Sequence, residues 1–505
     1  MSGIAGIISF HEDSAAPGLA KKLIGAMANR GPDGTGYWAQ ERVGLGHCML
    51  RTTPQSLSET QPLTNEEKTL ALTMDGRLDN REELGRKLRS GGISLRGCSD
   101  SEYALGAYEL WGEQSPVHLE GDFSFAVWDS HRKKLFCVRD RLGVKPLHYF
   151  LSQEYFAFAS EEEAFLELPG FHGKPRDDFV AGSLSGTDFG DILTESWLDG
   201  VFKLPPGSVL TIDLSGRKCI ESYWRLKPAE ELRFSSDKEY EEALLSQLKE
   251  AVECSVKSLG NPALMLSGGI DSASIAGVAR ELILNSNDKA LHTFSMVADE
   301  PHDCAETRNI RAIVRDFEPD ASLVPVHDEP GGISDRDLKQ AAWANAHPIG
   351  NHLLLPAMMY LSAARAGCRV MVDGVDGDVV TGTDFFYMKN MLRAGNFKDA
   401  WVECRFASEN NTFLRGRSPL SIFSRSAIST LVPTSARLLK ARFWKADHKG
   451  LLGLSVISRD FAKELHLHER AMEKRLNVTR HRPRSEQERH LRALMPEVPW
   501  SMSGF

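Results

Sequence analysis

The chain has 505 residues, of which 42% are hydrophobic and 26% are charged, and its formal net charge is −9. These fractions are close to the averages for soluble globular proteins, so the composition indicates neither a disordered chain nor a membrane protein. The acidic balance argues against a general nucleic-acid-binding protein, because such proteins usually carry basic surfaces that displace counterions from phosphates. We therefore expect no nucleic acid and no membrane among the partners.

The length, the cysteines and the amino terminus narrow the class further. The chain is too long for one hydrophobic core, and at roughly 100–200 residues per domain we expect two domains. The eight cysteines are scattered, with no C-x-x-C pair and no spacing typical of a metal site, which favours free thiols in a reducing compartment. The first apolar run lacks the flanks of a secretory signal, and no apolar stretch reaches the ~20 residues of a membrane-spanning helix. A cytoplasmic protein is expected.

The first elements in chain order predict a β-rich domain with a few helices. Apolar residues between positions 4 and 10 predict a buried strand near the terminus. Leu19, Leu23 and Met27 recur at helical spacing, and this helix should end before the R-G-P-D-G turn at 30–34. Further strands are predicted near residues 43–50, 69–75, 123–128, 134–139 and 155–160.

The pattern changes near residue 228, where we place the domain boundary. A charged and serine-rich connector occupies residues 225–238. Beyond it, apolar residues recur at helical spacing over 240–252, a short apolar run at 263–266 predicts a buried strand, and residues 275–283 predict an amphipathic helix. Alternating helices and strands are typical of a parallel α/β sheet. The expected domains are therefore residues 1–228 and 229–505.

The sharpest motif is L-S-G-G-I-D-S at residues 266–272, between a predicted strand and a predicted helix. There, glycines let the backbone approach an anion, hydroxyls and amides donate to phosphate oxygens, and the helix N-terminus adds a favourable dipole. No Lys-Ser or Lys-Thr pair follows the glycines, so this is not a Walker A motif. An ordinary strand-to-helix turn is the alternative. The residues expected to bind the diphosphate of a nucleotide are Leu266, Ser267, Gly268, Gly269, Asp271 and Ser272, with Asp271 also binding Mg²⁺.

A second loop combines glycines with carboxylates about a hundred residues later. Residues 369–372 predict another short buried strand, which ends in D-G-V-D-G-D at 373–378. Glycines such as Gly374 allow close approach to the nucleotide, and the carboxylates can hold a second metal or close the pyrophosphate site. A plain acidic turn is the alternative here.

Many further motifs occur in the order in which class B asparagine synthetases carry them. In the first domain they are R-G-P-D-G at 30–34, G-H at 46–47, Q-P-L at 61–63, D-S-E at 100–102, G-D-F-S-F-A at 121–126, R-D-R-L-G-V-K-P-L at 139–147 and A-S-E at 159–161. With the S-G-G-I-D-S loop, which is similar to the pyrophosphate loop of ATP pyrophosphatases, they make the chain resemble the asparagine synthetase superfamily. This resemblance implies an α/β and α+β protein. Its amino-terminal domain would be an Ntn-hydrolase-like αββα sandwich of the glutamine amidotransferase type 2, and its second domain a parallel α/β domain of the ATP-pyrophosphatase type (adenine nucleotide α hydrolase-like).

The resemblance implies additional residues around the nucleotide. Asp378 matches the acidic partner in the family's S-G-x-G-x-D-E motif, which makes it the second expected Mg²⁺ ligand beside Asp271. Met296 falls near the adenine pocket. Asp303 and Glu306 fall where the family places acidic residues after the second strand of this domain.

The first domain departs from the family where glutamine is hydrolysed. Ser2 stands in the place of the nucleophilic cysteine of the glutaminase. Met49 replaces the arginine of the family's G-H-x-R-L, which holds the carboxylate of glutamine, and the family's N-G-E reads Asp75-Gly76-Arg77. Losing one cation, and gaining another where the amino group of glutamine needs an acid, both oppose binding. Together with Asp100, these residues form a degenerate glutamine site, and we expect no glutaminase activity.

Superfamily members without glutaminase obtain the amine from their substrate and close a ring. They are the β-lactam synthetases and the cyclases that form the isopeptide bond of lasso peptides, and residues 373–378 and His347-Pro348 are most similar to the lasso type. The resemblance implies ATP, Mg²⁺ and a precursor peptide or small carboxylate as substrate. An Asp or Glu side chain of the peptide would be adenylated and then attacked by the peptide's own α-amine. A leader-binding protein and a leader protease are the expected partners.

One family element has no counterpart in the chain. Neither the E-x-R-x-P-F-x-D segment nor the lysine that follows it, which stabilises the transition states in the family, is found. No catalytic residue is assigned for this reason, and the second domain is expected to be short at its carboxyl end. Two other interpretations remain open: a glutamine- or ammonia-dependent asparagine synthetase, and a degenerate, non-catalytic homologue that binds nucleotide or peptide.

Overall fold

The computed structural model describes the greater part of the chain. The described residues are 1–11, 16–185, 194–227, 232–284, 291–298, 304–317, 320–325, 334, 336–337, 339, 354–375, 377, 385–410, 416–432, 436, 457–467 and 469–470. The expected boundary near residue 228 falls between two described ranges, and so it stays a prediction.

Two antiparallel sheets, each of six strands, form the described part of the first half. The first sheet has the order β10 (Val201–Lys203), β8 (His148–Leu151), β9 (Tyr155–Ala159), β1 (Gly3–Ser9), β3 (Val43–Cys48) and β2 (Thr35–Gln40). The second has the order β12 (Lys218–Ser222), β11 (Ser208–Asp213), β7 (Lys134–Arg139), β6 (Gly121–Asp129), β5 (Leu70–Leu78) and β4 (Leu63–Thr64). The five strands predicted after the first helix correspond to β3, β5, β6, β7 and β9, which confirms them.

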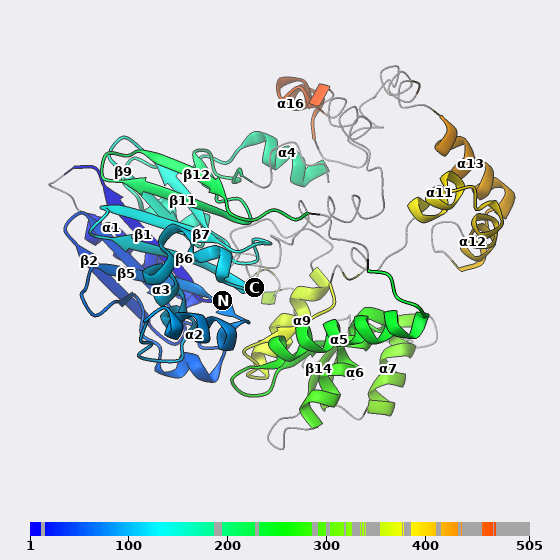
Figure 1. Cartoon of the computed structure of the whole chain (residues 1–505). Coiled ribbons are helices and arrows are strands. Elements are labelled where there is room, and N and C mark those ends of the chain that lie inside the picture. The colour runs from blue at the N-terminus through cyan, green and yellow to red at the C-terminus, as the bar shows by residue number, and fades with distance from the viewer. Residues whose placement is uncertain are drawn as a thin grey trace.

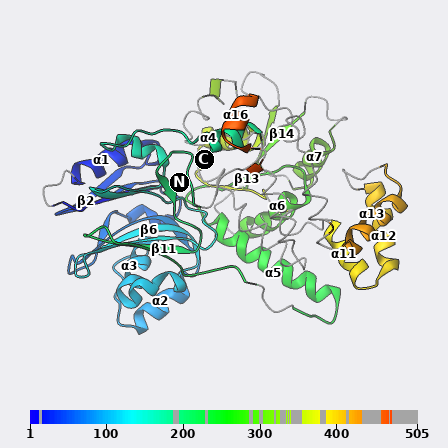
Figure 2. The same cartoon turned by 90° about the horizontal axis from the view of Figure 1, so that it is seen from above.

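Helices cover the outer face of each sheet, so that the half has four layers (Figure 2). Helix α1 (Ala16–Ala26) and the short 3₁₀ helix at Glu162–Glu167 cover the first sheet, and α2 (Arg81–Ser90) and α3 (Asp100–Trp111) cover the second. As expected, α1 ends before the 30–34 turn. This is the expected αββα sandwich.

The burial of β1 shows how the sequence builds these layers. Ile4 and Ile8 enter the core between the two sheets, whereas Ala5 and Ile7 enter the core beneath α1. Both faces of the strand are therefore covered, and every one of its residues is buried. A run without polar alternation is the pattern expected of a strand with two buried faces.

The second half is built on a parallel sheet with the order β15 (Asp320–Pro325), β14 (His292–Val297), β13 (Ala263–Met265) and β16 (Met371–Val372). Helices α5 (Asp237–Val256), α6 (Ile270–Leu284) and α7 (Ala305–Phe317) pack on one face, and α9 (Leu354–Arg365) packs on the other. Figure 1 shows these elements together below the sheets of the first half. The strand predicted at 369–372 is shorter than expected and only half-buried, because it is the edge strand of the sheet in the described residues.

The strand order places a topological switch point beside β13. The chain passes from β13 to β14 and then to β15 in one direction, and β16 returns to the opposite side of β13. Ligands of parallel α/β sheets bind in the crevice that opens at the carboxyl ends of the strands at such a reversal. The 266–272 loop follows β13 and the 373–378 loop follows β16, so the fold brings the two predicted loops to one crevice.

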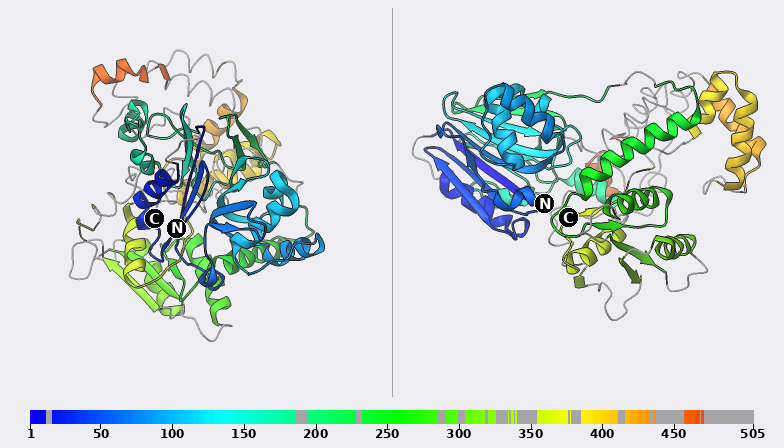
Figure 3. Two further views of the ribbon diagram at one scale, coloured as in Figure 1. Left: turned by 90° about the vertical axis from the view of Figure 1, so that its left-hand side faces the viewer. Right: turned by 60° about the horizontal axis from the view of Figure 1, so that its bottom comes forward.

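Further helices lie outside the parallel sheet. Helices α11 (Phe385–Arg393), α12 (Phe397–Asn410) and α13 (Pro419–Leu431) form a group beyond one end of the long helix α5 (Figure 3). Near the carboxyl end, α16 (Arg459–Glu464) belongs to a small apolar cluster that includes Ala181 of α4 (Asp177–Ser185) in the first half. In the described part of the chain, no helix combines the length and the apolar character that crossing a membrane requires.

Candidate functional site

The 266–272 loop leaves β13 and leads into α6, and its own hydroxyls hold its turn. Ser272 Oγ accepts from the Ser267 N–H at 3.2 Å and lies 3.0 Å from Ser267 Oγ. The Gly269 N–H donates to Ser267 Oγ at 3.4 Å. Leu266 is buried beneath the loop, and its N–H donates to the Phe294 carbonyl of β14. The turn is therefore tied to both the sheet and the first turn of α6.

Gly268 makes the close approach that the loop requires. Its φ is +77°, a left-handed conformation that side-chain-bearing residues rarely adopt. A Cβ at this position would lie 2.5 Å from the carbonyl oxygen of Glu306, in the first turn of α7. Asn309 Nδ2 donates to the Gly268 carbonyl at 3.0 Å, which fixes the loop against α7. Gly269 differs, since a Cβ there would meet nothing nearer than Ser267 Oγ at 3.5 Å.

Two glycines of the acidic loop bring its backbone against the 266–272 loop. A Cβ on Gly374 would lie 3.1 Å from the Ser272 nitrogen, and one on Gly377 would lie 2.6 Å from Asp271 Oδ2. The described residues of this loop therefore lie against the 266–272 loop, and the nucleotide role of both loops stays a prediction. Asp378 and Asp303, expected in the same site, lie outside the described residues.

These features suit the diphosphate of a nucleotide and its magnesium ion. Ser267 and Gly269 are exposed on the loop, and they stand at the N-terminus of α6, where backbone N–H groups favour an anion. Asp271 lies in the first turn of α6 and faces the acidic loop, where its carboxylate suits Mg²⁺. Among the described residues, no group of three or more metal-binding side chains occurs. When bound, Mg²⁺ neutralises the charge of departing pyrophosphate.

Met296 and Glu306, which were also expected near the nucleotide, make different kinds of contact. Met296 lies on β14, half-buried in the apolar cluster beneath α9. Glu306 meets the loop through its backbone carbonyl, which faces Gly268.

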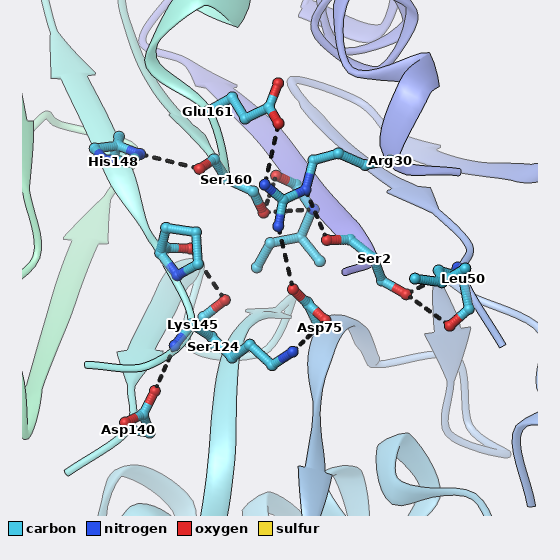
Figure 4. Close-up of polar contacts among 12 residues, drawn as sticks. Ser2, Arg30, Leu50, Asp75, Ser124, Asp140, Lys145, His148, Ser160 and Glu161 are labelled. Atoms are coloured by element: carbon cyan, nitrogen blue, oxygen red, sulfur yellow. Dashed lines mark hydrogen bonds and ion pairs between the residues drawn. The ribbon is translucent and has the colours of Figure 1, made fainter. Parts of the chain in front are cut away.

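Ser2 lies in the first half, between Arg30 and Leu50 in a buried polar cluster (Figure 4). Its hydroxyl donates to the Leu50 carbonyl at 3.3 Å and accepts from the Leu50 N–H at 3.0 Å. Its own carbonyl accepts from Arg30 Nε at 2.9 Å. The Ser2 hydroxyl therefore forms both of these hydrogen bonds with the backbone of Leu50, just after β3.

Arg30 belongs to a row of four charged side chains of alternating sign that passes beside Ser2. Arg30 pairs with Glu161 at 3.0 Å and lies 3.7 Å from Asp75, and Asp75 in turn lies 3.4 Å from Lys145 Nζ (Figure 4). All four side chains are nearly buried. Buried charges persist in proteins when each has a partner of opposite sign. The cluster therefore places a carboxylate, Asp75, beside Ser2.

The remaining residues of the expected glutamine site are committed to other contacts. Met49 is buried and apolar. Arg77 pairs with Asp79 at 2.8 Å, and Gly76 lies in the same strand with no room for a side chain. Asp100 accepts from the Leu78 N–H at 3.0 Å and lies 3.3 Å from Arg81, and burial raises its pKa to about 6.

Family models match both halves of the chain. A glutamine amidotransferase domain matches residues 1–224, and an asparagine synthase domain matches residues 243–501, about half of the chain. The chain belongs to the asparagine synthase family. The expected architecture, an Ntn-hydrolase-like domain followed by a parallel α/β synthase domain, is thereby confirmed.

Relatives of this family member carry two kinds of name. The amidase chry2 of Gibberella zeae is 32% identical over 299 residues, which are 56% of this chain and 43% of the relative. The amidase chyE of Penicillium rubens is 28% identical over 367 residues, 70% and 53% of the two chains. The glutamine-hydrolyzing asparagine synthetase 3 of Bacillus subtilis is 29% identical over 302 residues, 59% and 48% of the two chains. The aligned part thus spans about half the length of these relatives.

A cavity of about 700 Å³ lies between the two halves of this asparagine synthase family member. The first half contributes Ser2 and Asp75, and the second half contributes Tyr360 of α9 and Asp373, the residue after β16. The cavity therefore joins the region around Ser2 to the loop that follows β16.

An ion pair joins the two halves of the chain beside this cavity. Arg369, two residues before β16, donates to both carboxylate oxygens of Asp33 at 2.6 and 2.9 Å, and it also donates to the Arg51 carbonyl at 3.1 Å. The Leu259 N–H donates to the Thr52 carbonyl at 2.6 Å. Arg369 holds the pKa of Asp33 below its ordinary value.

Sequence reasoning did not single out four residues of this region: Arg30, Lys145, Tyr360 and Arg369. Arg30 and Lys145 each lie inside a family motif, so the sequence already indicated that two charged residues could belong to this site. The loop that carries Lys145 is held by Asp140, which accepts from the N–H groups of residues 142, 144 and 145. Tyr360 and Arg369 belong to no motif, and only the packing of α9 and β16 reveals them.

Proposed function

We propose that this chain forms an amide bond by activating a carboxylate with ATP. The geometry of the 266–272 loop is the observation that carries the proposal. It stands at the carboxyl end of β13 beside a topological switch point, with open backbone at Gly269 and the carboxylate of Asp271 facing the acidic loop. Family membership supports the same chemistry.

The proposed reaction has two steps. An oxygen of the carboxylate attacks the α-phosphorus of ATP, the bond to pyrophosphate breaks, and an acyl-adenylate forms. The nitrogen of an amine then forms the C–N bond, and AMP leaves with the electron pair of the broken C–O bond. The crevice contributes by holding both reactants in one orientation, which can lower a barrier by several kcal/mol.

We further propose that the amine belongs to the substrate and is not released from glutamine. The Asp75 carboxylate beside Ser2 opposes negative charge that would develop on a glutamine amide during attack. Met49 offers no charge for the carboxylate of glutamine, and Arg77 would repel its ammonium group. Macrolactam closure of a precursor peptide by its own α-amine, the lasso-type reaction, fits these features. A leader-binding protein, a leader protease and a cytoplasmic location belong to the same proposal.

ATP–pyrophosphate exchange tests the activation step, because it needs a carboxylate but no amine. Exchange is expected with a precursor-type peptide that carries an Asp or Glu side chain. It should fall at least about tenfold in Asp271→Asn, because even the loss of a group that only supports a metal ligand costs about 10- to 100-fold. Asp316→Asn is the matched control, since Asp316 is an exposed carboxylate of α7 that pairs with Arg315. Unchanged exchange in Asp271→Asn would refute the metal role.

The same assay separates the alternatives. Exchange driven by free aspartate, with asparagine formed from ammonia or glutamine, would replace ring closure by an asparagine synthetase. The family names of the Bacillus relatives favour testing this case beside the peptide. Absence of exchange with every carboxylate would leave a non-catalytic homologue.

A further inference from the structure

The carboxylates of the cavity between the halves are not equivalent. Asp75 is 3.4 Å from Lys145, Asp122 is 3.7 Å from Arg77, and both belong to the first half. Asp100 is 3.3 Å from Arg81, also in the first half. Each of these three carboxylates therefore has a basic partner within the first half.

The fourth carboxylate of the cavity wall, Glu59, is held within the first half by polar neighbours. Gln61 Nε2 donates to Glu59 Oε1 at 3.2 Å. Burial raises the pKa of Glu59, which is the change expected of a carboxylate removed from water. Glu59 thus has its hydrogen-bond partner within the first half.

Asp373 is the remaining carboxylate, and it stands on the synthase side. The Tyr360 hydroxyl donates to its Oδ2, and the Val375 N–H donates to its Oδ1 at 3.1 Å. In the part of the chain that the structure describes, no Lys or Arg side chain forms an ion pair with it. The phenol keeps its proton, because burial and the neighbouring carboxylate raise the pKa of Tyr360. Asp373 therefore presents a negative charge to the cavity, held in place by two neutral donors.

The position of Asp373 relates this charge to the reaction. The next residue, Gly374, lies against the first turn of α6, where a Cβ would approach the Ser272 nitrogen to 3.1 Å. An ion bound to Asp373 would consequently sit at the border between the cavity and the nucleotide crevice. A cationic group is favoured there, because the Asp373 carboxylate lines the cavity and has no ion-pair partner among the described residues.

We infer that Asp373 binds the attacking amine as its ammonium ion, and that Tyr360 positions the carboxylate. This inference rests on the proposed function and names the amine subsite of that reaction. The ammonium ion loses two protons to water in the course of amide formation, and its nitrogen forms the C–N bond while AMP leaves. An amine carried on a peptide can reach Asp373 from the cavity.

Two substitutions separate the charge of Asp373 from its structural contacts. Asp373→Asn keeps an oxygen that accepts from Tyr360 but removes the charge. Tyr360→Phe keeps the charge and removes the phenol hydroxyl. Methylamine serves as the probe: N-methylamide formation is followed as methylamine is titrated, and ATP–pyrophosphate exchange is measured beside it on the full chain with the same carboxylate.

Asp373→Asn is expected to raise the KM for methylamine at least about tenfold, the effect of one lost charge-assisted hydrogen bond, and to lower exchange by a smaller factor than this. Tyr360→Phe should raise this KM by no more than about threefold, as for the loss of one neutral hydrogen bond. An unchanged KM in Asp373→Asn, with exchange intact, overturns the inference alone. Equal losses of exchange and amide formation would assign Asp373 to the shape of the loop and overturn it as well. Absence of exchange in the unaltered chain removes the proposed function and this inference together.

Discussion

The two glycines of the nucleotide loop should respond very differently to an added methyl group. In Gly268→Ala, the new residue must adopt a φ of +77°, and its Cβ would lie 2.5 Å from the Glu306 carbonyl oxygen. In Gly269→Ala, the φ is ordinary, and the nearest atom is Ser267 Oγ at 3.5 Å. The first substitution strains the backbone and separates the loop from α7, whereas the second fits the existing structure.

The size of the effect follows from these distances. A left-handed conformation costs a side-chain-bearing residue roughly 1–2 kcal/mol, and forcing extra volume against a packed neighbour typically costs roughly 1–3 kcal/mol. The clash in Gly268→Ala involves a backbone carbonyl, which cannot turn away as a side chain can. We therefore expect a loss of about 2–5 kcal/mol in the free energy of unfolding of the second half. In a domain of this size, this corresponds to roughly 4–20 °C in Tm.

Scanning calorimetry of the full chain without nucleotide provides the measurement. Gly268→Ala should lower the transition of the second half and leave that of the first half in place, since the contact with α7 lies within the second half. Gly269→Ala should shift neither transition by more than about 1 °C, as expected for a substitution without strain or clash. Equal shifts in the two variants would refute the close approach on which the loop geometry depends.

Two further predictions concern the first half and its contact with the second. Asp33→Asn should lower stability by about 0.5–1 kcal/mol at neutral pH, because it weakens a partly exposed ion pair with Arg369. Since Arg369 lowers the pKa of Asp33, this stabilisation is present above the unfolded value of about 3.9 and is lost as pH falls through the folded value. Urea unfolding of both proteins at pH 7 and pH 3 measures it, with Asp316→Asn as the control; a difference that grows on acidification contradicts the assignment. Ser2→Cys should not confer glutamine hydrolysis, because Asp75 and Met49 remain unsuited to glutamine. Release of glutamate from glutamine is the assay, and steady release by this variant would show that the pocket still accepts glutamine.

Local patterns in the sequence were enough to identify the separate pieces of the site. The letters of the 266–272 loop, set between an apolar run and an amphipathic helix, sufficed to expect a phosphate-binding turn. The replacements at Ser2, Met49 and Arg77 were visible because each departs from a motif that is otherwise retained. The strands of the first half were predicted for a similar reason, since apolar runs such as that of β1 are local.

The strand at 369–372 shows where local patterns mislead. Its apolar residues suggested a buried strand, but the structure has only Met371–Val372 in the sheet, and these residues are half-buried. The reason is the position of β16 at one edge of the described sheet, which depends on strand order. A short apolar run has no feature that distinguishes a central strand from an edge strand.

The sequence by itself thus determined the kind of protein and located the loops that we propose to bind the nucleotide. Only the tertiary structure decided which of these groups act together. It joined the 266–272 loop to Gly374 across the switch point, set Arg30, Asp75 and Lys145 around Ser2, and placed Asp373 on the cavity between the halves. These contacts join residues far apart in the chain, and they form only when sheets and helices pack. Periodicity and spacing describe neighbours along the chain, whereas a pairing such as that of Arg369 with Asp33 depends on how two separately folded halves meet.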